Sequence, residues 1–376
     1  MKFGSRHRNR LVEAERFAGR ARSAEQLGAS NEALGWYDRA LASLEGQGAS
    51  EVLADVLRWK GSVHRECGDT TEAERLYARS AEIASEVGYA LGEAHVWNCR
   101  AILAQRRGDL ADATRHFTEA AVRATRAADT RLVTMIQRNL GIVANIRGDD
   151  EEAQARFELS LRHAERANDH DGMCRALNNL GIVHAHQGRY AEAEIVLGRA
   201  VSLATAMGDL MVECACKLSR AEMRIGAGKV SDAEQDCRAA LEIADRRGDR
   251  LRRAEGLKLL AAIWRLRGSL DTCDAILEEA LDLSDAGEDA LLVADLMCEK
   301  AELYRSRKQM PAAFALLRDA RTLYAGMGAA PQVHAVDEAI AGLGSSGASL
   351  FTTVGRRSGP TSLSPERPTP GAGVDR

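Results

Sequence analysis

The amino-acid sequence predicts an all-α protein, an α-solenoid of about eight helical hairpins of 40 residues each, closed by a C-terminal capping helix. Two observations carry this prediction. Residue columns recur every 40 residues over most of the chain, and no run of alternating β-branched residues indicates a strand. The most visible column holds Gly28, Gly68, Gly108, Gly148, Gly188, Gly228 and Gly268, with Lys308 at the eighth place.

Three more columns share this period and describe one face of a helix. The fifth residue after each loop glycine is small, the ninth is mostly large and apolar, and the twelfth is small again. These columns comprise Ala33, Ala73, Ala113, Ala153, Ala193, Ala233, Cys273 and Ala313; then Tyr37, Tyr77, Phe117, Phe157, Leu197, Cys237, Leu277 and Leu317; then Ala40, Ser80, Ala120, Ser160, Ala200, Ala240, Ala280 and Ala320. Because residues three or four apart share a helix face, the columns predict the packed side of a second helix.

The helix before each loop carries a matching small residue, seven places ahead of the glycine. This column reads Gly61, Ala101, Gly141, Gly181, Ala221, Ala261 and Ala301. A small residue on one helix makes room for a large residue on the other, so the two helices can approach closely. Each repeat is therefore predicted to be a hairpin of two helices, each of about 17 residues and about 25 Å.

Turn residues mark both ends of these helices. In Gly68-Asp69, Gly108-Asp109 and Gly148-Asp149, the glycine ends the first helix and the aspartate caps the second. A further Gly-Asp pair, as in Gly208-Asp209 and Gly248-Asp249, separates consecutive hairpins. The punctuation agrees with the packing columns.

The chain divides into four parts by composition. Residues 1–8 form a basic N-terminal segment, and residues 9–330 form the solenoid. Residues 331–344 are a capping helix that starts at a proline, ends at a glycine and has one apolar stripe. Residues 345–376 are rich in Ser, Gly, Pro and Thr and are expected to be disordered.

One repeat resembles a known family. Residues Asn179-Leu180-Gly181-Ile182-Val183-His184, followed by Gly188, Ala193, Leu197 and Ala200, are similar to the signature of the tetratricopeptide repeat. The resemblance covers about residues 10–328. The longer period and the lack of a closing proline are similar to the long-repeat branch, which includes cell-polarity adaptors, kinesin light chains and bacterial peptide sensors. The resemblance implies a right-handed superhelix that binds a partner in a concave groove.

Polar side chains recur on the first helices, at positions that the core columns leave free. They lie mainly ten, nine and three places before the loop glycine. We name this series the polar ladder; it comprises Arg58, Arg65, Asn98, Gln105, Arg138, Asn139, Asn145, Arg175, Asn178 and Asn179. An Asn amide offers a donor and an acceptor to a peptide backbone, and an Arg fork suits a carboxylate. The ladder predicts a groove for an extended, acid-containing peptide. The alternative is a merely solvated polar face.

The resemblance to tetratricopeptide adaptors implies that Asn98, Asn139, Asn178 and Asn179 hold a peptide main chain. The sequence thus favours a non-catalytic scaffold or adaptor. The alternative is a bacterial peptide-sensing or regulatory protein that acts on a separate transcription factor, ATPase or protease. The repeats begin near Asn9, so we expect no effector domain ahead of them.

Composition and motifs exclude several other functions. The net charge of -4 argues against nucleic-acid binding, and no apolar run is long enough to cross a membrane. Eight singly placed cysteines indicate reduced thiols and a cytoplasmic location. No catalytic or phosphate-binding motif occurs, so neither enzyme activity nor a cofactor is expected. His64 and Cys67 have the spacing of two metal ligands but lack further ligands nearby, so no metal site is expected.

Overall fold

The computed structural model describes residues 2–26, 29–284 and 290–343, and residues 2–8 by their backbone alone. The predicted disordered tail, residues 345–376, lies outside the described residues. Within them, no helix is both long enough and apolar enough to cross a membrane.

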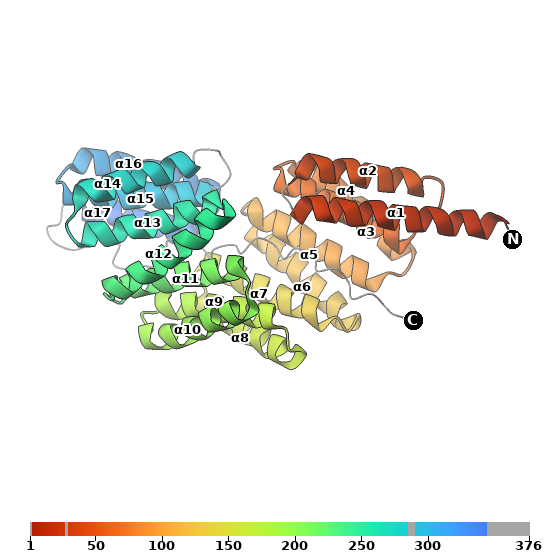
Figure 1. The fold of residues 1–376 in the computed structure, drawn as a ribbon, viewed down its shortest axis with the longest axis horizontal. Helices are drawn as coiled ribbons and strands as arrows, with labels where there is room; N and C mark the ends of the chain where they lie inside the picture. Colours follow the sequence, from red (N-terminus) through yellow and green to blue (C-terminus); the bar gives the residue numbers. More distant parts are fainter. Residues whose placement is uncertain (1, 27–28, 285–289, 344–376) are drawn as a thin grey trace. The chain divides into compact units, whose positions relative to one another are not determined.

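The described residues form seventeen helices and no strand (Figure 1). The first helices of the hairpins are α1 (Lys2–Gln26), α3 (Glu51–Glu66), α5 (Ala90–Arg106), α7 (Thr130–Arg147), α9 (His170–His186), α11 (Leu210–Gly226), α13 (Arg250–Leu266) and α15 (Ala290–Ser306). The second helices are α2 (Ser30–Leu44), α4 (Thr70–Glu86), α6 (Leu110–Arg126), α8 (Asp150–Ala167), α10 (Tyr190–Met207), α12 (Val230–Arg247), α14 (Leu270–Ser284) and α16 (Met310–Gly326). A single helix, α17 (Ala330–Gly342), follows them. The predicted all-α solenoid class is confirmed.

The ends of the helical region differ slightly from the predicted segments. Helix α1 begins at Lys2, so the basic residues 2–8 continue the first helix of the first hairpin. Helix α17 starts at Ala330 and carries Pro331 in its first turn, where a missing N–H costs nothing. Its buried Val336 and Ala339 join the apolar cluster of the last hairpin, which includes Leu317 and Tyr324.

The columns of small and large residues meet inside each hairpin as their spacing predicts. An ideal Cβ placed on Gly141 would lie 2.6 Å from the ring of Phe157. One placed on Gly181 would lie 2.3 Å from the Cγ atom of Leu197. A real Cβ atom does not fit at such distances. The glycines therefore let the large residue of the second helix rest against the backbone of the first.

The chain folds as two compact units, and the boundary lies inside α7, between Ile136 and Gln137. In the second unit, the loop after α7 approaches the start of α17. An ideal Cβ placed on Gly148 would lie 3.3 Å from Cγ of Pro331. The two ends of this unit are therefore in contact.

First helices of neighbouring hairpins contact one another within each unit. Such contacts join α1 with α3 and α3 with α5 in the first unit, and α9 with α11, α11 with α13 and α13 with α15 in the second. Among the described residues, no two second helices contact each other to the same extent. We call the side of the first helices turned away from the second helices the inner face. The polar ladder was predicted there.

Candidate functional site

The ten residues of the polar ladder are divided between the two units. Arg58, Arg65, Asn98 and Gln105 lie on α3 and α5 of the first unit. The other six, Arg138, Asn139, Asn145, Arg175, Asn178 and Asn179, lie on α7 and α9 of the second unit. The polar ladder therefore consists of two separate groups of residues, one in each unit.

Most of the ladder is buried, which does not fit a merely solvated helix face. Eight of the ten residues are at most 8% exposed, and only Arg58 and Gln105 are half-buried. The physical reason is the contact between neighbouring first helices, which takes side chains at these positions out of water. The ladder is thus recessed between helices, and its hydrogen bonds have to be accounted for atom by atom.

Ion pairs occupy much of the inner face of the first unit. Arg58 donates to the Asp55 carboxylate at 2.8 Å, and the hydroxyl of Tyr89 donates to the same group at 3.2 Å. Arg65 and Arg106 both bind Glu66, at 2.6 and 3.0 Å. Burial would raise the pKa of Glu66, but the two guanidinium groups outweigh it and lower that pKa.

Two half-buried titratable groups lie close to Arg58. Burial, and to a smaller extent the charge of Arg58, lowers the pKa of His95 to about 3, so its imidazole is neutral at physiological pH. Burial raises the pKa of Glu25, which accepts a hydrogen bond from the hydroxyl of Tyr37. With a pKa of about 3, the imidazole of His95 is not poised to exchange protons near neutral pH with a bound substrate.

The amide of Asn178, on α9 of the second unit, has no hydrogen-bond partner. The side chain is 0% exposed, and neither its Oδ1 atom nor its Nδ2 atom is paired. Oδ1 of Asn145, on α7, is also buried and unpaired. Leaving a polar group buried without a partner costs about 1–3 kcal/mol. These amides present one donor and two acceptors that the protein itself does not use.

Further along the same unit, the polar groups satisfy one another. Lys258 on α13 binds Asp295 on α15 at 2.9 Å, and the hydroxyl of Tyr324 donates to the same carboxylate at 2.6 Å. Arg265 binds Glu299 at 2.5 Å. These pairs were not predicted from the sequence. Lys258 and Asp295 carry opposite charges at inner-face positions of successive repeats, and this was the signal that could have predicted their pairing.

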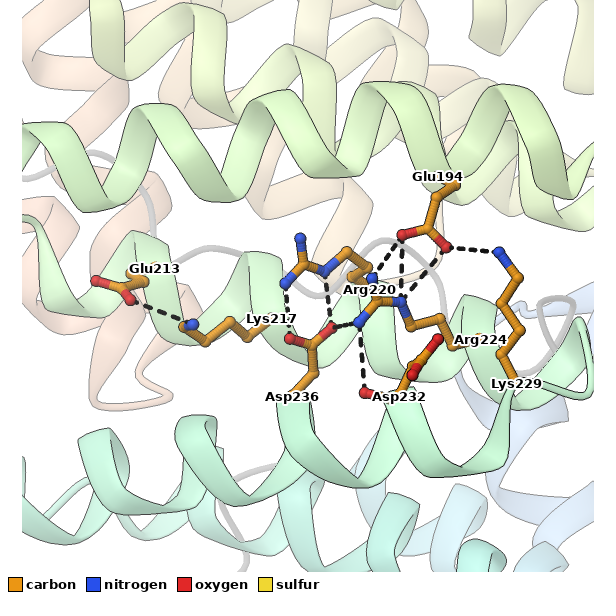
Figure 2. A network of polar contacts seen from close by, with 8 residues as sticks. All are labelled: Glu194, Glu213, Lys217, Arg220, Arg224, Lys229, Asp232 and Asp236. Atoms are coloured by element: carbon orange, nitrogen blue, oxygen red, sulfur yellow. Dashed lines mark hydrogen bonds and ion pairs between the residues drawn. The ribbon is translucent and has the colours of Figure 1, made fainter.

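A network of ion pairs also links α10, α11 and α12 (Figure 2). Arg220 makes two hydrogen bonds of 2.7 Å to Asp236, which also receives one from Arg224 at 2.9 Å. Arg224 and Lys229 bind Glu194, at 2.6 and 3.3 Å. Hydrogen bonds from Arg224 lower the pKa of Glu194. The network ties α10, α11 and α12 together.

His64 and Cys67, which have the sequence spacing of two metal ligands, lie in different surroundings. His64 lies 3.2 Å from the carboxylate of Asp69, and Cys67 is exposed. Within the described part of the chain, no three His, Cys, Asp or Glu side chains gather where they could hold a metal ion.

Comparison with known proteins identifies the repeat. A family model described as tetratricopeptide repeat matches residues 52–126 and 132–206. A comparison with curated proteins finds no significant match.

Several solved structures have the same fold. A Rap protein complexed with competence and sporulation factor matches with a TM-score of 0.58 and 12% identity, over 90% of this chain and 99% of that one. NprR in complex with its cognate peptide NprX matches with a TM-score of 0.57 and 13% identity, over 82% of this chain and 88% of that one. Aspartyl phosphate phosphatase F from Bacillus subtilis matches with a TM-score of 0.61 and 13% identity, over 75% and 73%. At such low identity the likeness is one of fold alone.

Proposed function

Because this chain belongs to the tetratricopeptide repeat family, we propose that it is a non-catalytic adaptor that binds an extended segment of a partner protein along its inner helices. The proposal is one of protein binding because charged side chains described above bind one another, as Arg220 binds Asp236 and Lys258 binds Asp295. Such repeats serve many roles, so particular side chains determine what a given repeat protein binds.

The observation that carries the proposal is the unpaired amide of Asn178. An extended peptide presents one N–H and one C=O per residue, and these groups match the Oδ1 and Nδ2 atoms of an asparagine. Binding would replace an unfavourable buried amide by two hydrogen bonds. Asn145, whose Oδ1 atom also lacks a donor, would accept a further main-chain N–H. Because Asn178 is fully buried, the bound segment has to move neighbouring side chains aside.

Arginines of the same helices favour a segment that contains acidic residues. Arg138 lies on α7 and Arg175 on α9. The planar guanidinium group of an arginine can bind one carboxylate through two parallel hydrogen bonds. Arg175 holds Asp171 through hydrogen bonds of 2.8 and 2.9 Å, so a ligand carboxylate would compete with that residue. The affinity should therefore fall as the salt concentration rises.

A second candidate is a regulatory protein that senses a peptide and acts on a separate transcription factor, ATPase or protease. It is favoured by the fold shared with NprR, whose structure contains a cognate peptide. The two candidates differ in what the bound protein does rather than in how it is held. Recovering partners on the intact chain and identifying them by mass spectrometry separates a structural partner from a regulated enzyme or transcription factor.

Selection from a phage-displayed library of random peptides, followed by calorimetric titration of the best binder, tests the proposed site. Asn178→Ala should weaken binding about fivefold to a hundredfold, as expected for the loss of two hydrogen bonds. The melting temperature of the free protein should not fall, because the amide makes no bond within it. The matched control is Asn98→Ala, at the same place of its repeat in the first unit, where the residue is not without a partner.

The control should lower the stability of the free protein, because it removes an interaction that the free protein makes. If Asn178→Ala lowers stability and leaves the affinity as it was, the amide is structural and the peptide site lies elsewhere. Raising the salt concentration should weaken binding by the wild type more than binding by Arg138→Ala.

A further inference from the structure

We propose that Arg58 and Trp59, together with Arg22, form a binding site for an oxyanion, the carboxylate or phosphate group of a partner, on the inner side of the first unit. This site is separate from the amides of the second unit and does not depend on them. The three residues belong to two neighbouring first helices, α1 and α3, which contact each other.

Two hydrogen-bond donors of adjacent residues lack an acceptor at this place. The central carbon of the Arg22 guanidinium group lies 5.1 Å from the ring centre of Trp59, and that of Arg58 lies 5.3 Å from it. Nε1 of Trp59 and Nε of Arg58 are both buried and unpaired. Both atoms are obligate donors, so their missing partner is an acceptor. The side chain of Arg58 keeps 11% of its surface exposed, which gives the site an opening to solvent.

The neighbouring acids do not supply that acceptor. Asp55 is already held by another nitrogen of Arg58 and by the Tyr89 hydroxyl. Glu25 is taken up by the hydroxyl of Tyr37, and burial raises its pKa, which favours its neutral form. His95 is neutral because its pKa is lowered to about 3. Because Nε of Arg58 belongs to a positively charged guanidinium group, an anionic acceptor is favoured.

A second tryptophan of the same unit provides a matched comparison. The guanidinium groups of Arg100 and Arg123 lie 5.3 and 5.2 Å from the ring centre of Trp97. Like Arg58, both arginines bind carboxylates: Arg100 binds Glu74, and Arg123 binds Glu93 and Glu119. The indole nitrogen of Trp97 is not a buried atom without a partner. Stacked arginines alone therefore do not distinguish the proposed site, whereas the unpaired donors do.

The test is calorimetric titration of the full chain with inorganic phosphate and, separately, with a hexaglutamate peptide, at an ionic strength held constant with sodium chloride. The wild type should bind at least one of the two probes saturably. Trp59→Phe keeps the ring but removes the N–H, and Arg58→Lys keeps the charge but removes the Nε donor. Each should weaken binding about tenfold, while Trp97→Phe should leave it unchanged.

Binding of hexaglutamate alone identifies a carboxylate site, and binding of phosphate alone identifies a phosphate site. The proposal is overturned if neither probe binds, or if Trp59→Phe and Trp97→Phe affect binding equally. If Trp59→Phe unfolds the protein, Arg58→Lys decides the question, and unchanged binding by it counts against the site. Because every variant lies in the first unit, failure here leaves the proposed peptide site in the second unit untouched.

Discussion

Single residues determine how closely the two helices of a hairpin approach. Gly181 lies on α9 where the side chain of Leu197, on α10, rests against the backbone. Gly198 lies on α10 itself, and an ideal Cβ there would have no atom within 4 Å. The two glycines are both helical, so they differ in steric surroundings and not in backbone conformation.

We expect Gly181→Ala to lower the free energy of unfolding by about 1–3 kcal/mol, because the new methyl group displaces Leu197 from a packed core. Gly198→Ala should instead raise it by about 0.5–1 kcal/mol, because alanine favours the helix and meets no obstacle. Urea denaturation of both variants measures the difference. Equal effects would mean that Leu197 moves aside freely and that the glycine is not what sets the helix spacing.

At the scale of whole helices, five of the second helices begin in one of two ways. Asp69, Asp109 and Asp149 cap α4, α6 and α8 by accepting a backbone N–H three residues on. Helices α10 and α12 begin after Arg189 and Lys229, which make no such cap. These two residues reach the second helix of the preceding hairpin instead, at Gln154 and Glu194. A capping bond within one hairpin is thus exchanged for a bond between hairpins.

Replacing these residues by alanine should separate the two contributions. Asp149→Ala should cost about 1 kcal/mol of unfolding free energy, the usual value of a lost N-cap. Lys229→Ala should change it by less than about 0.5 kcal/mol, because its pair with Glu194 is half exposed and screened by water. Urea denaturation again gives both values. A larger loss for Lys229→Ala would show that contacts between hairpins outweigh capping.

At the scale of the whole molecule, a solenoid has to cover the apolar face of its last repeat. Helix α17 does so: its Val336 and Ala339 pack with Leu317 and Tyr324 of α16. The residues after 344 lack the apolar content needed to offset the entropy of ordering.

Removing residues 345–376 should therefore leave the melting temperature within a degree or two, whereas removing residues 330–376 should lower it by several degrees. Thermal unfolding followed by circular dichroism compares the two truncations. A large loss from the shorter truncation would mean that Leu350, Phe351 and Val354 pack against the helices.

Much of the architecture follows from the sequence because it depends on residues less than 40 positions apart. The small and large columns, the loop glycines and the aspartate caps each depend on residues close together in the sequence, and they recur from repeat to repeat. Gly181 belongs to the small column of the first helices and Leu197 to the large column of the second helices, and the structure brings the two together. Helix α1 begins at Lys2, ahead of the residue near which the sequence places the first repeat.

The sequence by itself thus determined the hairpins, their packing faces and the position of a polar series on the first helices. Only the tertiary structure decided which of those polar groups are paired. Lys258 meets Asp295 across 37 positions, and Arg224 meets Glu194 across 30. The amide of Asn178, Nε of Arg58 and Nε1 of Trp59 have no hydrogen-bond partner. The reason is physical: pairing depends on the rotation of each hairpin relative to the next, and no residue column encodes that angle.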